Sequence, residues 1–252
     1  MQLDEVLENY SRSDKLRIAA AFGIVFLAYS FIQLVFPVGT YSIMHYYITT
    51  AAFALLALAA RKVEKSRGFS GAPGALPALL IGLGLGALSY AALNVVRPGG
   101  WNPAQAAGFW ATAISAYVLI CFLLARLPRD EVLNNSLFAA LISLAPSLTF
   151  FLSDGIARVA TASVNLLPAF LVFYSFFLTR KLWLGSAIIT ASIATAFLMG
   201  SSLSATAVMP SVTIKNILNV FIVYAAAILA LREIHSKMQN LKATSLQSIF
   251  GR

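Results

Sequence analysis

Two histidines, His45 and His235, and one cysteine, Cys121, are the residues to consider first for catalysis or metal binding. They form no HExxH pair and no Cys and His cluster with the spacing of metal ligands. The long apolar stretches of the chain also contain no two carboxylates at helical spacing, the usual arrangement for acid and base chemistry. We therefore expect no metal, no cofactor and no catalytic residues, and we predict that the protein is not an enzyme.

Polar side chains inside the apolar stretches are more informative. Amides in such positions either hydrogen-bond to neighbouring helices, which contributes only about 0.6 kcal/mol each, or they line a water-filled cavity. A proline in the same place removes a backbone donor and bends a helix. The candidate residues for a substrate path, which could form a polar vestibule, are Gln33, Asn94, Asn165, Pro168, Lys215, Asn216 and Asn219.

Three charged residues, Arg97, Asp154 and Arg158, lie between apolar stretches. A charge at the centre of a bilayer costs about 2.5–3.5 kcal/mol even on the lenient insertion scale, so we expect these residues at the outer membrane interface. There they would be the acid and the anion-binding groups that an enzyme acting on lipids or polyprenyl chains requires. They are the basis for the third of the functions considered below.

Gly82 and Gly86 form a GxxxG pattern within an apolar stretch. Such a pattern allows two helix backbones to approach closely where lipid provides no hydrophobic driving force. We expect these glycines to pack helices within one chain, and homodimerisation is the alternative.

The composition explains why these residues must be positioned by membrane helices. The 252-residue chain is 60% hydrophobic and 11% charged, against about 45–50% and about 25% in soluble domains. So few charges cannot cover the surface of a soluble domain of this size. The net charge of +9 does not indicate a nucleic-acid partner, because the basic residues separate apolar stretches and do not gather in one segment.

Eight stretches have about the 20 apolar residues that a helix needs to cross the hydrocarbon core. Each must be helical, because a strand or loop facing lipid would leave backbone polar groups without partners. We therefore predict an all-α, polytopic membrane helix bundle with spans at 18–36, 42–60, 75–96, 106–125, 136–152, 159–178, 183–203 and 213–231.

The distribution of Lys and Arg predicts the orientation of this bundle. With eight spans, 15 of the 18 basic residues fall on one side and only Arg97, Arg158 and Lys215 on the other. The side rich in Lys and Arg is normally cytoplasmic. We expect both termini in the cytoplasm and a multi-pass protein of the plasma membrane.

The two ends of the chain are predicted to flank the bundle formed by residues 18–231. Residues 1–17 place Leu3, Val6 and Leu7 on one side of a short amphipathic helix, and the basic segment 232–252 does the same with Ile234, Met238 and Leu241. Both segments are expected on the inner membrane surface, and docking of another protein is the alternative.

These observations leave three functions open. The first is a transport or translocation component, such as a permease, a channel or the membrane conduit of a larger machine. The second is a non-catalytic subunit that anchors a membrane protein complex, and the third is the lipid-active enzyme described above. The expected partners are the lipid bilayer, other membrane subunits or a cytoplasmic ATPase, and a second copy of the chain.

Overall fold

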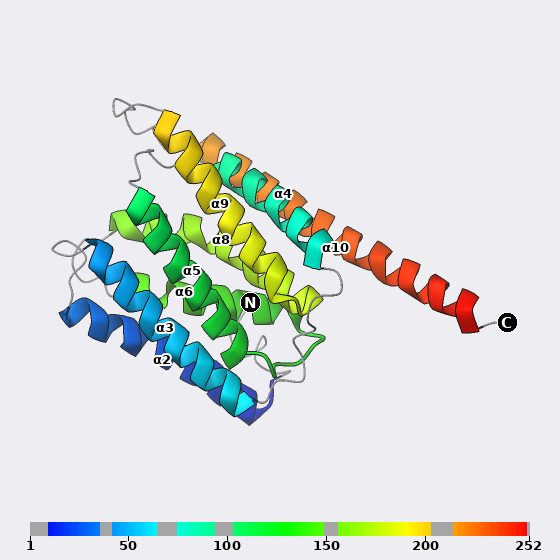
Figure 1. The fold of residues 1–252 in the computed structure, drawn as a ribbon, viewed down its shortest axis with the longest axis horizontal. Helices are drawn as coiled ribbons and strands as arrows, with labels where there is room; N and C mark the ends of the chain where they lie inside the picture. Colours follow the sequence, from blue (N-terminus) through cyan, green and yellow to red (C-terminus); the bar gives the residue numbers. More distant parts are fainter. Residues whose placement is uncertain are drawn as a thin grey trace.

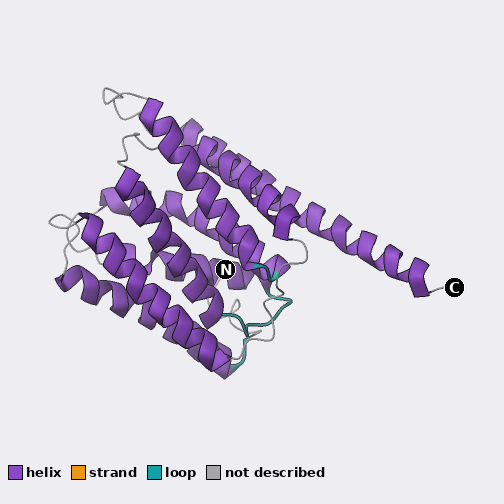
Figure 2. Ribbon diagram, in the orientation of Figure 1, coloured by secondary structure: helices purple, strands orange, loops and turns teal. Residues whose placement is uncertain are grey.

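The computed structural model describes residues 10–35, 42–64, 75–93, 103–148, 156–202 and 214–250 (Figure 1). All regular secondary structure in these ranges is α-helical, and Figure 2 draws helices and loops only. The helices are α2 (Arg12–Val35), α3 (Ser42–Glu64), α4 (Ala75–Leu93), α5 (Pro103–Leu123), α6 (Val132–Leu148), α8 (Ile156–Thr179), α9 (Leu182–Ser202) and α10 (Ile214–Phe250). The all-α prediction is confirmed, and each helix overlaps one predicted span.

Local sequence signals fix several helix ends. Ser11 caps α2: its Oγ accepts a hydrogen bond from the Asp14 backbone N–H at 3.2 Å, and its hydroxyl donates to the Asp14 carboxylate at 2.5 Å. Pro103 starts α5, where a missing N–H leaves no bond unmade. Pro168 lies inside α8 without ending the helix.

Three helix pairs pack most closely: α4 with α9, α3 with α5, and α6 with α8. The first pair depends on Gly82 and Gly86, which face α9 of the same chain. A Cβ atom at Gly86 would lie only 2.6 Å from the Cβ of Ala191, and the Ser192 hydroxyl donates to the Gly86 carbonyl at 3.1 Å. The GxxxG face of α4 is thus covered by α9.

The core lies where α5, α8 and α9 meet. Its fully buried side chains are aliphatic and aromatic, among them Leu119, Ile120, Leu171, Phe176 and Ile188. Tyr117 also lies there, with its hydroxyl packed against Gly185. The outer helices complete the bundle by packing around this centre.

Large apolar side chains also cover the outside of the bundle. On α2, Leu27, Phe31 and Leu34 are exposed, and Leu55 of α3 and Leu229 of α10 are exposed in the same way. Soluble monomers rarely present apolar surface of this extent. By length and composition, Arg12–Val35 and Ala106–Leu123 could cross a membrane. These two helices give weak support for membrane association.

Hydrogen bonds connect Tyr10, which precedes α2, with helix α6 and the turn between α5 and α6. Tyr10 donates a hydrogen bond to Asn135 Oδ1 at 2.6 Å, and Asn135 Nδ2 donates to the Pro128 carbonyl, also at 2.6 Å. The Tyr10 ring packs edge-on against Phe138. The pKa of Tyr10 lies well above its ordinary value, mainly because the hydroxyl is buried. Among the nearby negative charges, Glu131 raises this pKa most, so the hydroxyl stays a donor.

Arg180 closes the same end of the bundle from the turn between α8 and α9. Its guanidinium donates to the carbonyls of Ala125 at 3.0 Å and Leu127 at 3.4 Å, and lies over the ring of Phe177 at 5.3 Å. Burial and the charge of Arg129 lower the pKa of Arg180. Its backbone φ of 56° is in the left-handed region that commonly ends a helix.

The segment after the last predicted span is not separate from it. Helix α10 runs without a break from Ile214 to Phe250 and extends well beyond the other helices (Figure 1).

Candidate functional site

The structure describes only part of the predicted substrate path. Asn94, Arg97 and Asp154 lie outside the described residues. Another five lie in helices, but their side chains are outside the described part: Arg158, Asn165, Lys215, Asn216 and Asn219. Gln33 and Pro168 are described, in α2 and α8 respectively.

The helix arrangement separates these residues into two groups. Helix α10 packs on α8 and α4, so the helices that contain Asn165 and Asn219 are neighbours. Helix α2 packs on α6, α3 and α5, and it lies on the opposite flank of the bundle from α10 (Figure 1). A single vestibule that contains both Gln33 and the α10 residues stays a prediction.

The structure places His45 of α3 against Tyr29 of α2 and next to Tyr46. With Gln33, one helical turn after Tyr29 on α2, we call these residues the α2–α3 cluster: Tyr29, Gln33, His45 and Tyr46. His45 is its centre and is only 1% exposed. The imidazole meets the ring of Tyr29 at 5.4 Å between centroids and that of Tyr46 at 6.1 Å, both nearly perpendicular. Gln33 follows Tyr29 by four residues, which places both on the same side of α2.

Gln33 differs from the other members of the cluster in its hydrogen bonding. Its Oε1 atom is buried and accepts no hydrogen bond from any residue that the structure describes, and the same holds for the Ser30 hydroxyl. A buried acceptor without a partner costs about 1–3 kcal/mol. Such an atom is therefore suited to accept a hydrogen bond from a solute or from water.

Hydroxyl groups extend the cluster into the α3–α5 interface. Thr50 donates to the Tyr46 carbonyl at 2.8 Å, and Thr112 of α5 also lies 3.0 Å from that carbonyl and 3.0 Å from the Thr50 hydroxyl. Gly108 makes this approach feasible, since a Cβ there would lie 2.9 Å from the Cβ of Tyr46. The cluster therefore adjoins the closely packed α3–α5 pair.

Chemically, the α2–α3 cluster combines one imidazole, two phenol rings and an amide acceptor without a described partner. This set can bind a polar solute by hydrogen bonds. Among the described residues, no three His, Cys, Asp or Glu side chains gather as a metal site would require.

The sequence marks Gln33 as a candidate but gives no role to His45, because a lone histidine matches no motif. A usable signal was present in the short connection between the two helices. Residues 36–41 separate α2 from α3, and short connections join antiparallel neighbours. That geometry alone brings the end of α2 next to the start of α3, and so places Tyr29 and Gln33 near His45.

Comparison with models of protein families, with curated protein sequences and with solved structures finds no match to this chain.

Proposed function

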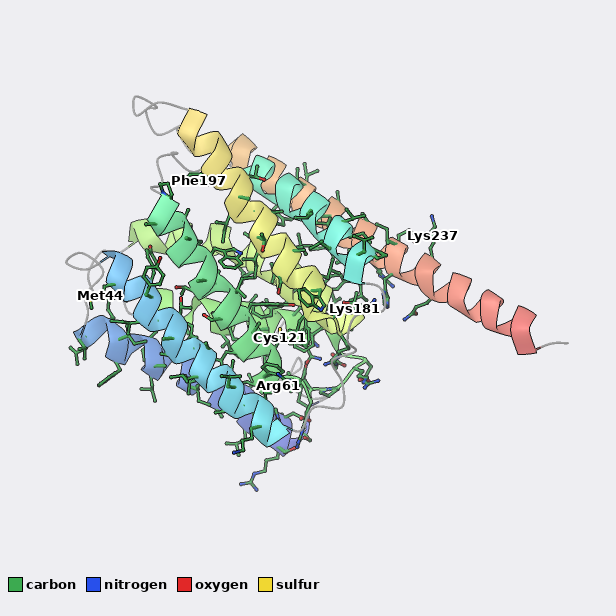
Figure 3. All side chains as sticks on the ribbon, in the orientation of Figure 1. Met44, Arg61, Cys121, Lys181, Phe197 and Lys237 are labelled. Atoms are coloured by element: carbon green, nitrogen blue, oxygen red, sulfur yellow. The ribbon has the colours of Figure 1, made fainter. Side chains whose placement is uncertain are left out.

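We propose that the chain crosses the membrane eight times, with both termini in the cytoplasm. The apolar exterior of α2, α3, α4 and α10 supports this, because lipid is the solvent that such a surface requires. The ends of the helices support the orientation. Arg61 and Lys181 lie at one end of the bundle, and Met44 and Phe197 lie at the other (Figure 3).

Within that bundle, the function that the geometry favours is transport or translocation of a polar solute. The observation that carries it is the buried His45 in contact with Tyr29, one helical turn before Gln33, whose buried acceptor is satisfied by no described residue. Polar and ionisable side chains are expensive inside a membrane and usually mark a path for substrates or protons. The cluster lies at the ends of α2 and α3 that we assign to the outer face, where a solute could enter from outside.

A structural subunit is the second candidate, and a specific observation favours it too. Several buried or half-buried hydroxyls, including those of Thr49, Ser136 and Ser175, donate to carbonyls of their own helix. Hydroxyls bonded in this way are satisfied without a solute. A bundle of this kind could serve only to anchor partner proteins.

Adjacent residues on α2 separate these possibilities. We expect a cysteine at Gln33, in a Cys121→Ala background, to react with a membrane-impermeant thiol reagent added outside intact cells. A cysteine at the next residue, Leu34, should remain unlabelled although Leu34 is 81% exposed, because it faces lipid. Mass spectrometry of the purified protein measures both reactions.

Other outcomes would contradict specific parts of the proposal. Labelling of both cysteines would mean that water and not lipid surrounds α2. Labelling of neither would show that the cluster is dry, and would favour the structural subunit.

Release of entrapped solutes from proteoliposomes then tests transport itself, with protons, K⁺, glycine and glucose as probes. At least one should cross faster than in protein-free liposomes, and His45→Leu should remove the difference. Flux of none of the four would contradict transport of small polar solutes.

A further inference from the structure

Helix α10 has a bundle part and a projecting part. In the bundle part, Tyr224, Ala227 and Leu231 form a buried stripe. The helix then continues in line, past the ends of α4 and α9, and Lys237 lies on the part that projects (Figures 1 and 3). We call residues 232–250 the α10 extension.

The buried stripe of α10 continues into the extension in the same register. After Leu231 the apolar residues are Ile234, Met238 and Leu241, at steps of three, four and three. This is the heptad spacing of a helix that packs against another helix. Exposure changes abruptly along it, from 2% at Leu231 to 37% at Ile234. The apolar stripe therefore continues along α10 beyond the point where the helix packs against the bundle.

A projecting amphipathic helix of this kind is expected to pack its apolar face against another surface. Isolated helices shorter than about 12–15 residues are marginal in water, and longer ones gain most of their stability from packing an apolar face. The intrahelical ion pair between Lys237 and Glu233 is exposed, with a distance of 3.3 Å, and adds only a few tenths of a kcal/mol.

The basic residues of the extension indicate which kind of surface packs against the apolar stripe. On the heptad defined by Leu231 and Ile234, Lys237 and Lys242 occupy the two positions that flank the apolar stripe. In a parallel pair of two copies, Lys237 of one copy would face Lys242 of the other, and the like charges would repel. The inner membrane surface would suit a basic amphipathic helix, but α10 would have to turn sharply to reach it, and the helix has no break.

We propose that the α10 extension is a docking helix for an acidic amphipathic helix of a partner protein. The partner places apolar side chains on the stripe of Ile234, Met238 and Leu241, and its carboxylates pair with Lys237 and Lys242. This inference goes beyond the transport function and does not depend on it. It adds a partner to a part of the chain that the α2–α3 cluster does not involve.

The test uses the full-length protein in nanodiscs of zwitterionic lipid and a fluorescent designed peptide. The peptide is an amphipathic helix of three heptads with leucine at the two core positions and glutamate at the two flanking positions. Anisotropy should report saturable binding. Lys242→Glu should weaken it about tenfold, and Ile234→Ser with Met238→Ser should abolish it. Arg232→Glu makes the same charge change on the opposite side of the helix and should leave binding nearly unchanged.

A peptide with lysine in place of glutamate gives the reciprocal result if the proposal is correct. It should bind the Lys237→Glu, Lys242→Glu double variant and not the wild-type protein. Equal binding of both peptides to the wild type, or binding of neither, would overturn the proposal. So would an efficient disulfide between two copies through Met238→Cys, which would mean that a second copy covers the stripe. Protection of the extension from proteolysis by anionic vesicles, without any peptide, would also overturn the proposal and would identify lipid as the surface on which the stripe packs.

Discussion

Replacing Gly86 with leucine should destabilise the bundle by about 3 kcal/mol or more and should lower the yield of folded protein. Even a single added carbon at this position would collide with Ala191 and with the backbone of α9 at Ile188. Backbone atoms cannot rotate aside as the end of a flexible side chain can, so α4 and α9 would have to separate. Overpacking in cores already costs about 1–3 kcal/mol where side chains can adjust. Thermal unfolding in detergent measures the loss.

Gly84 provides the matched control, because it lies on the same helix and the space beside it is open. A Cβ at Gly84 would meet nothing within 4 Å. Gly84→Leu should therefore keep the wild-type melting temperature or raise it, since leucine favours helix more than glycine does. Equal destabilisation by the two substitutions would contradict the α4–α9 packing described here.

Replacing Arg180 with alanine should cost about 2–4 kcal/mol, because it leaves the carbonyls of Ala125 and Leu127 without their donor. It also removes the cation from the face of Phe177. Alanine must in addition keep the positive φ of this position, which is unfavourable for any residue with a Cβ.

Arg180→Gly separates the two contributions. Glycine loses the same hydrogen bonds but adopts a positive φ freely, so this variant should be about 1 kcal/mol more stable than Arg180→Ala. Arg180→Lys keeps the charge but lacks the forked donors, and should fall between alanine and wild type. A melting series in which glycine is worse than alanine would show that backbone strain is not part of the cost at this position.

The positions of the helices could be predicted from the sequence because each depends on local information. Each of the eight predicted apolar stretches overlaps one helix of the described residues, and two of these helices are long and apolar enough to cross a membrane. The end of a predicted span need not be the end of a helix. The last span is predicted to end at Leu231, and α10 continues to Phe250, because polar residues of good helix propensity extend a helix beyond its apolar stretch.

The partners of each helix could not be predicted in the same way. Packing of α4 on α9 brings together residues about 100 positions apart, and the sequence shows only that Gly82 and Gly86 permit some close approach. The candidate site is an intermediate case. Gln33 is recognisable as a polar residue in an apolar stretch and the short connection predicts that α2 and α3 are neighbours, but nothing in the sequence marks the lone His45 as part of a site.

The most direct test of the proposed membrane arrangement is reaction of single cysteines with an impermeant thiol reagent in intact cells, again without Cys121. Cysteines at Ser66 and Ser236 should be protected until the cells are lysed, whereas one at Gly100 should react at once. This pattern is expected because 15 of the 18 basic residues fall on the side assigned to the cytoplasm. Reaction at Ser66 before lysis, or protection at Gly100, would contradict the eight-span arrangement with both termini inside.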